Sequence, residues 1–92
     1  MKDKLVTFMS ENDIDFQIAT GSELNGACTV ISGYADHIDA SQEDILAAIK
    51  EHTGEKASME TRRELARVFN FATTYNYGKW WNSTEAKRTY KF

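Results

Sequence analysis

The sequence predicts a small α+β domain with elements in the order α-β-β-α-α-β, in which an antiparallel sheet of about three strands packs against helices. Apolar residues recur at helical spacing near the N-terminus and within residues 41–75. They alternate with polar residues in 13–18 and 86–92, as in half-buried strands. With 92 residues, the chain is expected to form one compact domain over 1–92.

The N-terminal segment has the pattern of a short amphipathic helix. Leu5, Val6, Phe8 and Met9 share one helical face, and Asn12 is expected to end the helix.

Two strands are expected next, joined as an antiparallel hairpin. Ile14, Phe16 and Ile18 alternate with polar residues, and the β-branched run in 27–32 forms the second candidate strand. The glycine-bounded segment 21–26 between them is typical of a loop.

A second helix is expected between Ser41 and Gly54. Ser41 can accept a hydrogen bond at the N-terminus, and Asp44 completes an acidic variant of the capping box. Gly54 tolerates the left-handed conformation that ends many helices. The expected buried stripe consists of Ile45, Leu46, Ala48 and Ile49.

A third helix is expected to begin near Ser58. The sequence allows two alternatives for its C-terminal end. The helix stops near Asn76 and Gly78, or residues 75–81 are extended instead. Residues 86–92 are expected to form an edge strand, with an all-helical final third as the alternative. The apolar face of the third helix is expected to consist of Leu65, Val68, Phe69, Ala72 and Tyr75.

The distribution of charge is more informative than the net charge of −3. Residues 1–60 hold four Lys and twelve Asp or Glu, a net charge of −8. Residues 61–92 hold seven Lys or Arg and two Glu, a net charge of +5. An acidic front joined to a basic tail indicates a protein that binds charged partners.

The composition argues against several classes of protein. No apolar run approaches the roughly 20 residues of a membrane span, and no signal peptide is recognisable. The single Cys28 cannot form an internal disulfide, which favours a cytoplasmic location. His37, His52 and Cys28 lie at no metal-ligand spacing, and no nucleophile or phosphate-loop motif is present. We therefore expect no enzymatic activity, catalytic residue, cofactor or metal.

The tail in residues 61–92 combines seven of the eleven basic residues with eight of the eleven aromatic residues. Cations neutralise phosphates and aromatic rings stack on unpaired bases, and the same residue types dominate protein interfaces. Two structural alternatives remain open: most aromatics form the core, and the arginines neutralise the acidic front. The predicted contacts to a partner or nucleic acid are Arg62, Arg63, Arg67, Tyr77, Lys79, Trp81, Lys87, Arg88 and Lys91.

An acidic protein-binding face is predicted around the second helix. Such clusters can imitate the charge of nucleic acid or cover a basic groove; the alternative is that most of these charges serve solubility and helix capping. The candidate residues are Asp36, Asp39, Glu43 and Asp44.

These features favour a non-enzymatic inhibitor that docks on a larger protein or nucleoprotein complex and blocks it. In size, charge partition, lack of disulfides and lack of catalytic motifs, the chain resembles the small inhibitors that phages direct against host complexes, anti-CRISPR proteins among them. The resemblance is one of overall character and assigns no site residue. The alternatives are a stand-alone single-stranded RNA- or DNA-binding module that uses the tail, and an acidic immunity protein or antitoxin.

Overall fold

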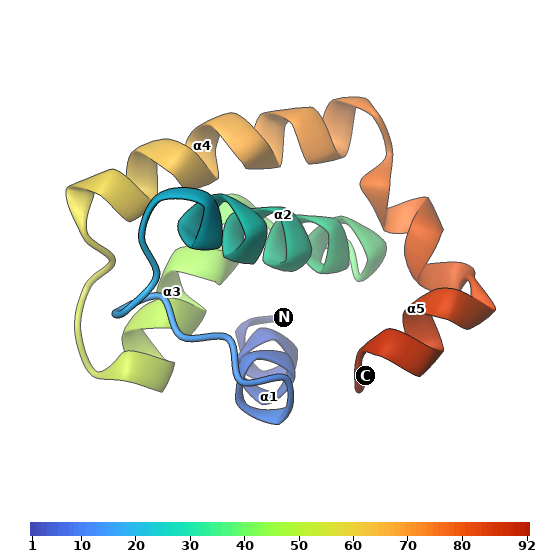
Figure 1. Cartoon of the computed structure of the whole chain (residues 1–92), viewed down its shortest axis with the longest axis horizontal. Coiled ribbons are helices and arrows are strands. Elements are labelled where there is room, and N and C mark those ends of the chain that lie inside the picture. Colours follow the sequence, from blue (N-terminus) through green and yellow to red (C-terminus); the bar gives the residue numbers. More distant parts are fainter.

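The computed structural model describes residues 1–92 and contains helices only (Figure 1). The predicted α+β fold with a three-stranded sheet is therefore wrong. The elements are α1 (Lys2–Glu11), α2 (Gly21–His37), α3 (Gln42–Thr53), α4 (Met59–Thr74), the 3₁₀ helix η1 (Tyr77–Asn82) and α5 (Thr84–Thr89).

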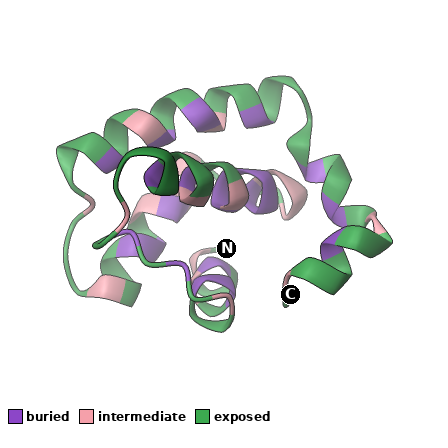
Figure 2. Cartoon of the chain, in the orientation of Figure 1, coloured by how far each residue is buried: buried purple, intermediate pink, exposed green.

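Helix α2 lies at the centre of the arrangement. It contacts α4 on one side and η1 near its C-terminal end, while α1 and α3 pack against each other on the other side (Figure 1). The buried residues lie on the facing sides of these helices (Figure 2). No helix is both long enough and apolar enough to cross a membrane.

The second predicted strand, residues 27–32, lies inside α2. Three glycines and a β-branched run give α2 weak intrinsic helix propensity. However, Leu24, Cys28, Ile31 and Ala35 follow a helical spacing, and all four are buried. Burial of this stripe outweighs the local preference, as tertiary packing commonly does.

The first predicted strand, residues 14–18, is a turn-rich connection between α1 and α2. Asp13 has a positive φ of 54°, and the Asp15 carboxylate accepts a hydrogen bond from the Gln17 backbone N–H at 2.9 Å. The buried side chains of Ile14 and Phe16 anchor this connection to the core, whereas Ile18 is exposed. No strand pairs with this segment.

The third predicted strand, residues 86–92, is also wrong because α5 occupies most of it. Ser83 caps this helix by accepting a hydrogen bond from the Ala86 N–H at 3.1 Å. Asn76 adopts the left-handed conformation, and η1 follows it. Residues 75–81 are thus not extended, and the all-helical alternative for the final third is confirmed.

The three helices predicted with sequence signals are confirmed. Helix α1 ends at the Asn12 cap, and α3 has both hydrogen bonds of the Ser41–Asp44 capping box and a left-handed Gly54. Ser58 caps α4 by accepting a hydrogen bond from the Thr61 N–H. One part of the α4 prediction is wrong: Tyr75 follows the last helical residue and is 65% exposed.

Trp81 lies at the centre of an aromatic cluster that joins the C-terminal third to the rest of the chain. Only 3% of its surface is exposed. Its ring centroid lies 5.4 Å from that of Phe8, 5.3 Å from that of Tyr34 and 5.1 Å from that of Tyr90. Such aromatic pairs each add about 0.5–1.5 kcal/mol beyond the burial of their area.

Two glycines allow η1 to approach α2 closely enough for this cluster to form. A Cβ atom on Gly33 would lie 2.9 Å from Trp81 Nε1, and one on Gly78 would lie 2.6 Å from the His37 backbone nitrogen. The Gly78 N–H donates a hydrogen bond of 2.9 Å to the Asp36 carboxylate, which holds η1 against the end of α2.

The last residues of the chain are tied to the end of α1. The Asn12 side chain donates a 2.8 Å hydrogen bond to the Lys91 carbonyl and accepts another of 2.8 Å from the Lys91 N–H. This paired contact fixes the backbone next to Tyr90 and Phe92, whose rings belong to the aromatic cluster.

The Gly78→Ala variant tests the close approach of η1 to α2. The added methyl group meets backbone atoms that cannot rotate away, so the free energy of unfolding should fall by about 1–3 kcal/mol. Gly26→Ala is the matched control, because no atom lies within 4 Å of its Cβ position. It should raise the free energy of unfolding by about 0.5–1 kcal/mol through helix propensity. Urea denaturation measures both changes, and a Gly78→Ala variant as stable as the parent would contradict the packing described.

Candidate protein-binding groove along helix α2

One side of α2 carries small residues and opens to the surface. Gly26, Val30 and Gly33 follow the i, i+4, i+7 spacing on the side opposite the buried stripe; Gly26 is exposed and Val30 is half-buried, whereas Gly33 is buried beneath Trp81. Ala27 and Thr29 extend this surface on either side. Because these side chains are short, they form the floor of a depression between the segments that flank α2.

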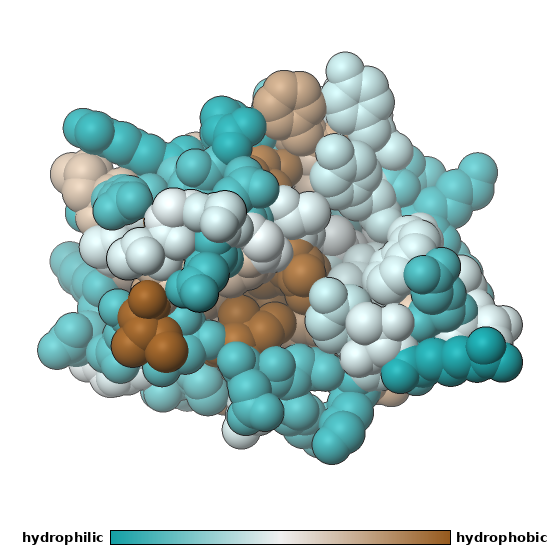
Figure 3. Space-filling model, in the orientation of Figure 1, coloured by the Kyte–Doolittle hydropathy of each residue, from teal (hydrophilic) through white to brown (hydrophobic).

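Two depressions meet along this side of α2 and share Val30 and Tyr90. Their volumes are about 290 and 340 Å³. We call the combined feature the α2 groove. Figure 3 shows a hollow with hydrophobic atoms at the centre of this face. The groove is lined by Asp13, Ile14, Asp15, Ile18, Ala19, Glu23, Gly26, Ala27, Thr29, Val30, Gly33, Tyr77, Trp80, Trp81 and Tyr90.

One end of the α2 groove is acidic. Asp13, Asp15 and Glu23 are exposed there and line the groove, two from the α1–α2 connection and one from the first turn of α2. Ile18 also lines this end and is 74% exposed, the largest exposed fraction among the bulky apolar side chains. Burial of this side chain by a partner would remove its apolar surface from water.

The other end of the α2 groove is aromatic. The rings of Trp80 and Trp81 lie 5.1 Å apart and nearly perpendicular, at 88°. Because Trp81 fills the core, its neighbour is directed outward, and Trp80 is 40% exposed. Tyr77 is exposed beside it and lines the same end.

These positions correct the prediction for Trp81. Its side chain is buried in the aromatic cluster and cannot be a principal contact for a partner. Trp80, which the sequence analysis did not single out, has the exposed ring instead.

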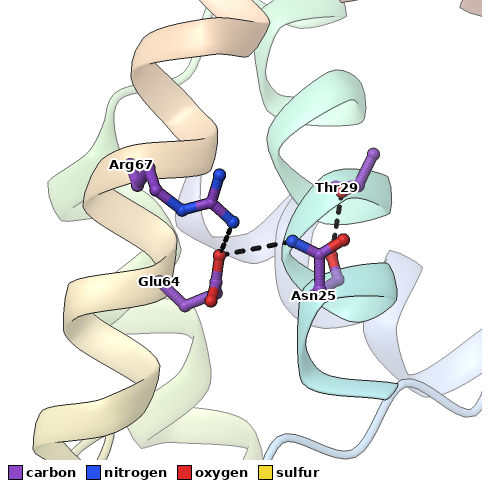
Figure 4. Close-up of polar contacts among 4 residues, drawn as sticks. All are labelled: Asn25, Thr29, Glu64 and Arg67. Atoms are coloured by element: carbon purple, nitrogen blue, oxygen red, sulfur yellow. Dashed lines mark hydrogen bonds and ion pairs between the residues drawn. The ribbon is translucent and has the colours of Figure 1, made fainter. Parts of the chain in front are cut away.

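The three arginines predicted to form a cluster on α4 do not all lie on one face of the helix. At about 100° per residue, Arg63 and Arg67 lie within about 40° of each other, whereas Arg62 lies further round. The first two share a shallow depression with Glu60 and Glu64. Arg67 forms an ion pair with Glu64, whose carboxylate also accepts a 3.3 Å hydrogen bond from Asn25 Nδ2 on α2 (Figure 4). Arg67 is therefore engaged within the chain.

The other predicted basic contacts are exposed but come from different elements. Lys79 lies on η1, while Lys87 and Arg88 lie in the last turn of α5. Lys91 follows α5, with an exposed side chain and a backbone held by Asn12. None of these four lines the α2 groove.

Two of the four residues predicted to form the acidic face have internal partners. Asp36 accepts the hydrogen bond from Gly78, and Asp44 belongs to the capping box of α3. Hydrogen bonds from the Ser41 backbone and side chain hold the pKa of Asp44 below its usual range. Asp39 and Glu43 are exposed.

The titratable residues considered for chemistry do not converge. No group of three His, Cys, Asp or Glu side chains could hold a metal ion. Burial of Cys28, with a smaller effect from Glu64, raises the pKa of its thiol to about 12. A thiol with this pKa stays protonated at neutral pH and is a poor nucleophile. His37 packs near the rings of Tyr34 and Phe92.

The sequence contains signals for the groove that the strand interpretation hid. Once residues 21–37 are treated as one helix, the buried stripe and the small-residue side lie opposite each other. Recognition of the acidic end required the structure, because the α1–α2 connection brings Asp13 and Asp15 to the beginning of α2.

The candidate site thus consists of an apolar floor, an acidic end and an aromatic end. The chain matches no protein-family model, no curated protein and no solved structure.

Proposed function

We propose that this protein is a non-enzymatic inhibitor that docks on a larger protein or nucleoprotein complex through the α2 groove and blocks it. The observation that supports this proposal is the pair of adjoining depressions that share Val30 and Tyr90, with the exposed Ile18 lining one and the exposed Trp80 lining the other. A shallow surface of this kind suits a protein partner better than a small substrate, which needs a more enclosed site.

Burial of the groove residues supplies an energetic basis for docking. Full burial of one large apolar side chain stabilises an interface by about 1.5–3 kcal/mol. Trp80 and Tyr77 are of the residue types that most often dominate binding energy when they enter a partner's pocket. Contacts from these side chains and Ile18 would be the principal anchors of the complex.

The charges around the groove support a target that presents both signs of charge. Asp13, Asp15 and Glu23 favour a basic protein surface at one end. The exposed Lys79, Lys87 and Arg88 on η1 and α5 are available to acidic groups or phosphates nearby. A nucleoprotein complex offers both, which is why we favour it. Inhibition would then act by occlusion of that complex, in the manner expected of an anti-CRISPR-like phage inhibitor.

A second candidate function, single-stranded nucleic-acid binding, is favoured by a pair of aromatic rings at the end of α4. Phe71 and Tyr75 are both exposed, and their rings are stacked with centroids 5.9 Å apart and planes within 12°. An unpaired base can stack on such rings.

The acidic immunity-protein alternative has less support. Asp36 and Asp44 serve the fold, so only Asp39 and Glu43 remain free on the face that this function would use.

Site-specific crosslinking in the native host tests the proposed function. Replacement of Ile18 or Trp80 by p-benzoylphenylalanine should yield photo-crosslinks to one defined partner, identified by mass spectrometry. The same replacement at Ala47 or His52, which are exposed on α3 outside the groove, is the matched control and should yield none. The purified protein should then inhibit the activity of that partner complex. Crosslinks from α3 but not from the groove positions would contradict the proposed docking site.

Oligonucleotide binding separates the second candidate from the first. If the protein acts on nucleic acid alone, a fluorescein-labelled mixed-sequence 20-mer should bind at low salt and dissociate as salt rises. A Phe71→Ala, Tyr75→Ala double variant should weaken that binding about tenfold, because stacking contributes about 1–3 kcal/mol per base. The matched control is Thr73→Ala on another side of α4. No binding of the parent protein at low salt would reject this candidate.

A further inference from the structure

We infer that the α2 groove receives an amphipathic helix of a partner protein, with Lys or Arg residues at the end that lies beside Asp13, Asp15 and Glu23. This inference rests on the proposed function, which assigns the groove to a protein partner. It adds the conformation, orientation and charge of the segment that binds.

The floor of the groove fits a helix. Gly26 has no side chain and Val30 a short one, and they lie one helical turn apart on the open part of the floor, so a second helix can approach α2 there at the usual interaxial distance of about 8–10 Å; Gly33 beyond them is already covered by Trp81. From Glu23 to Val30, α2 rises about 10 Å, which corresponds to about two turns of a partner helix. The chain has no strand, so an extended peptide has no sheet edge with which to pair.

The walls of the groove provide apolar contacts on both sides of that floor. Ile18 lies at the acidic end, Tyr90 near the middle and Trp80 at the aromatic end. Anchors at i, i+3, i+4 and i+7 of a partner helix would meet these three side chains and Val30 along one apolar stripe.

The three carboxylates at the acidic end have no cationic partner within the chain. The ion pairs of the structure are Lys2–Glu51 and Glu64–Arg67, and no Lys or Arg lines the groove. Binding an apolar segment there would leave these charges close to a desolvated interface, which is unfavourable unless the partner supplies cations. The charge therefore selects a segment with a basic end.

The direction of the partner helix follows from the same charges. The acidic end lies beside the N-terminus of α2. Cations stabilise the C-terminal turn of a helix, because the helix dipole is negative there. A partner helix with Lys or Arg in its last turn would thus run antiparallel to α2, which also pairs the opposite dipole ends.

Three fluorescein-labelled 18-residue peptides test the inference by fluorescence anisotropy at low salt. All have leucines at i, i+3, i+4 and i+7 on one helical face. They differ in charge: three lysines in the last turn, three glutamates in the last turn, or three lysines in the first turn. The peptide with C-terminal lysines should bind at least about tenfold more tightly than either of the others, because opposite charges at an interface favour association and like charges oppose it.

Neutral variants of the groove identify the carboxylates involved. A triple Asp13→Asn, Asp15→Asn, Glu23→Gln variant should weaken binding of the C-terminal-lysine peptide about tenfold. Asparagine retains the acceptor that Asp15 presents to Gln17, so the connection should stay folded. The matched control, Asp39→Asn, Glu43→Gln, Glu55→Gln, changes the net charge equally outside the groove and should bind normally. Equal weakening in both triple variants would overturn the assigned carboxylates.

The Val30→Arg variant separates failure of this inference from failure of the proposed function. It should abolish peptide binding by placing a cation on the floor. Because Val30 also packs against the core, Gly26→Arg is the second variant: its added side chain meets no neighbouring atom within 4 Å, so it should abolish binding while circular dichroism remains native. If Val30→Arg blocks binding but the three peptides bind equally, the groove stands and the basic helix is wrong. If no peptide binds, or if a proline-rich extended peptide binds more tightly, the inferred helical partner segment is wrong. The crosslinks from positions 18 and 80 then test the groove as a docking site independently of this inference.

Discussion

The structure depends on the burial of Trp81 between α2 and the C-terminal end of the chain. This one side chain contacts aromatic rings from α1, α2 and the segment after α5, so it joins parts of the sequence that are otherwise far apart. The contact requires a backbone without side chains at Gly33 and Gly78, where any Cβ would collide with its neighbour. Because Trp81 points inward, Trp80 points outward, and the aromatic end of the α2 groove is a consequence of the core.

About half of the fold could be predicted from the sequence, and the reasons are local. Helices α3 and α4 begin or end at residues that determine the helix terminus through local contacts. Ser41 and Ser58 accept hydrogen bonds from backbone N–H groups three residues later, and Gly54 adopts the left-handed conformation. The three strands were wrong because alternation and β-branching are weak evidence without a partner strand. In α2, burial of the stripe from Leu24 to Ala35 decides the conformation, and that burial depends on helices distant in sequence.

The candidate site was less predictable than the fold. The uneven distribution of charge in the sequence predicted an acidic face and a basic tail, but it named none of the acidic residues that line the α2 groove. It could not indicate that Asp36 and Asp44 have internal partners or that Glu64 engages Arg67, since these contacts depend on the geometry of the helices. The groove itself combines residues 13–33 with 77–90, a juxtaposition set by tertiary packing.

Hydrogen–deuterium exchange in the free and partner-bound protein tests the central claim most directly. The segments 13–20 and 77–82 contribute the acidic and the aromatic end of the α2 groove, so backbone exchange in both should slow when the partner is bound. Exchange in the exposed last turn of α3 should remain unchanged, because that helix lies outside the groove. Slower exchange confined to α3 or to the first turns of α1, with both ends of the groove unaffected, would contradict docking at the groove.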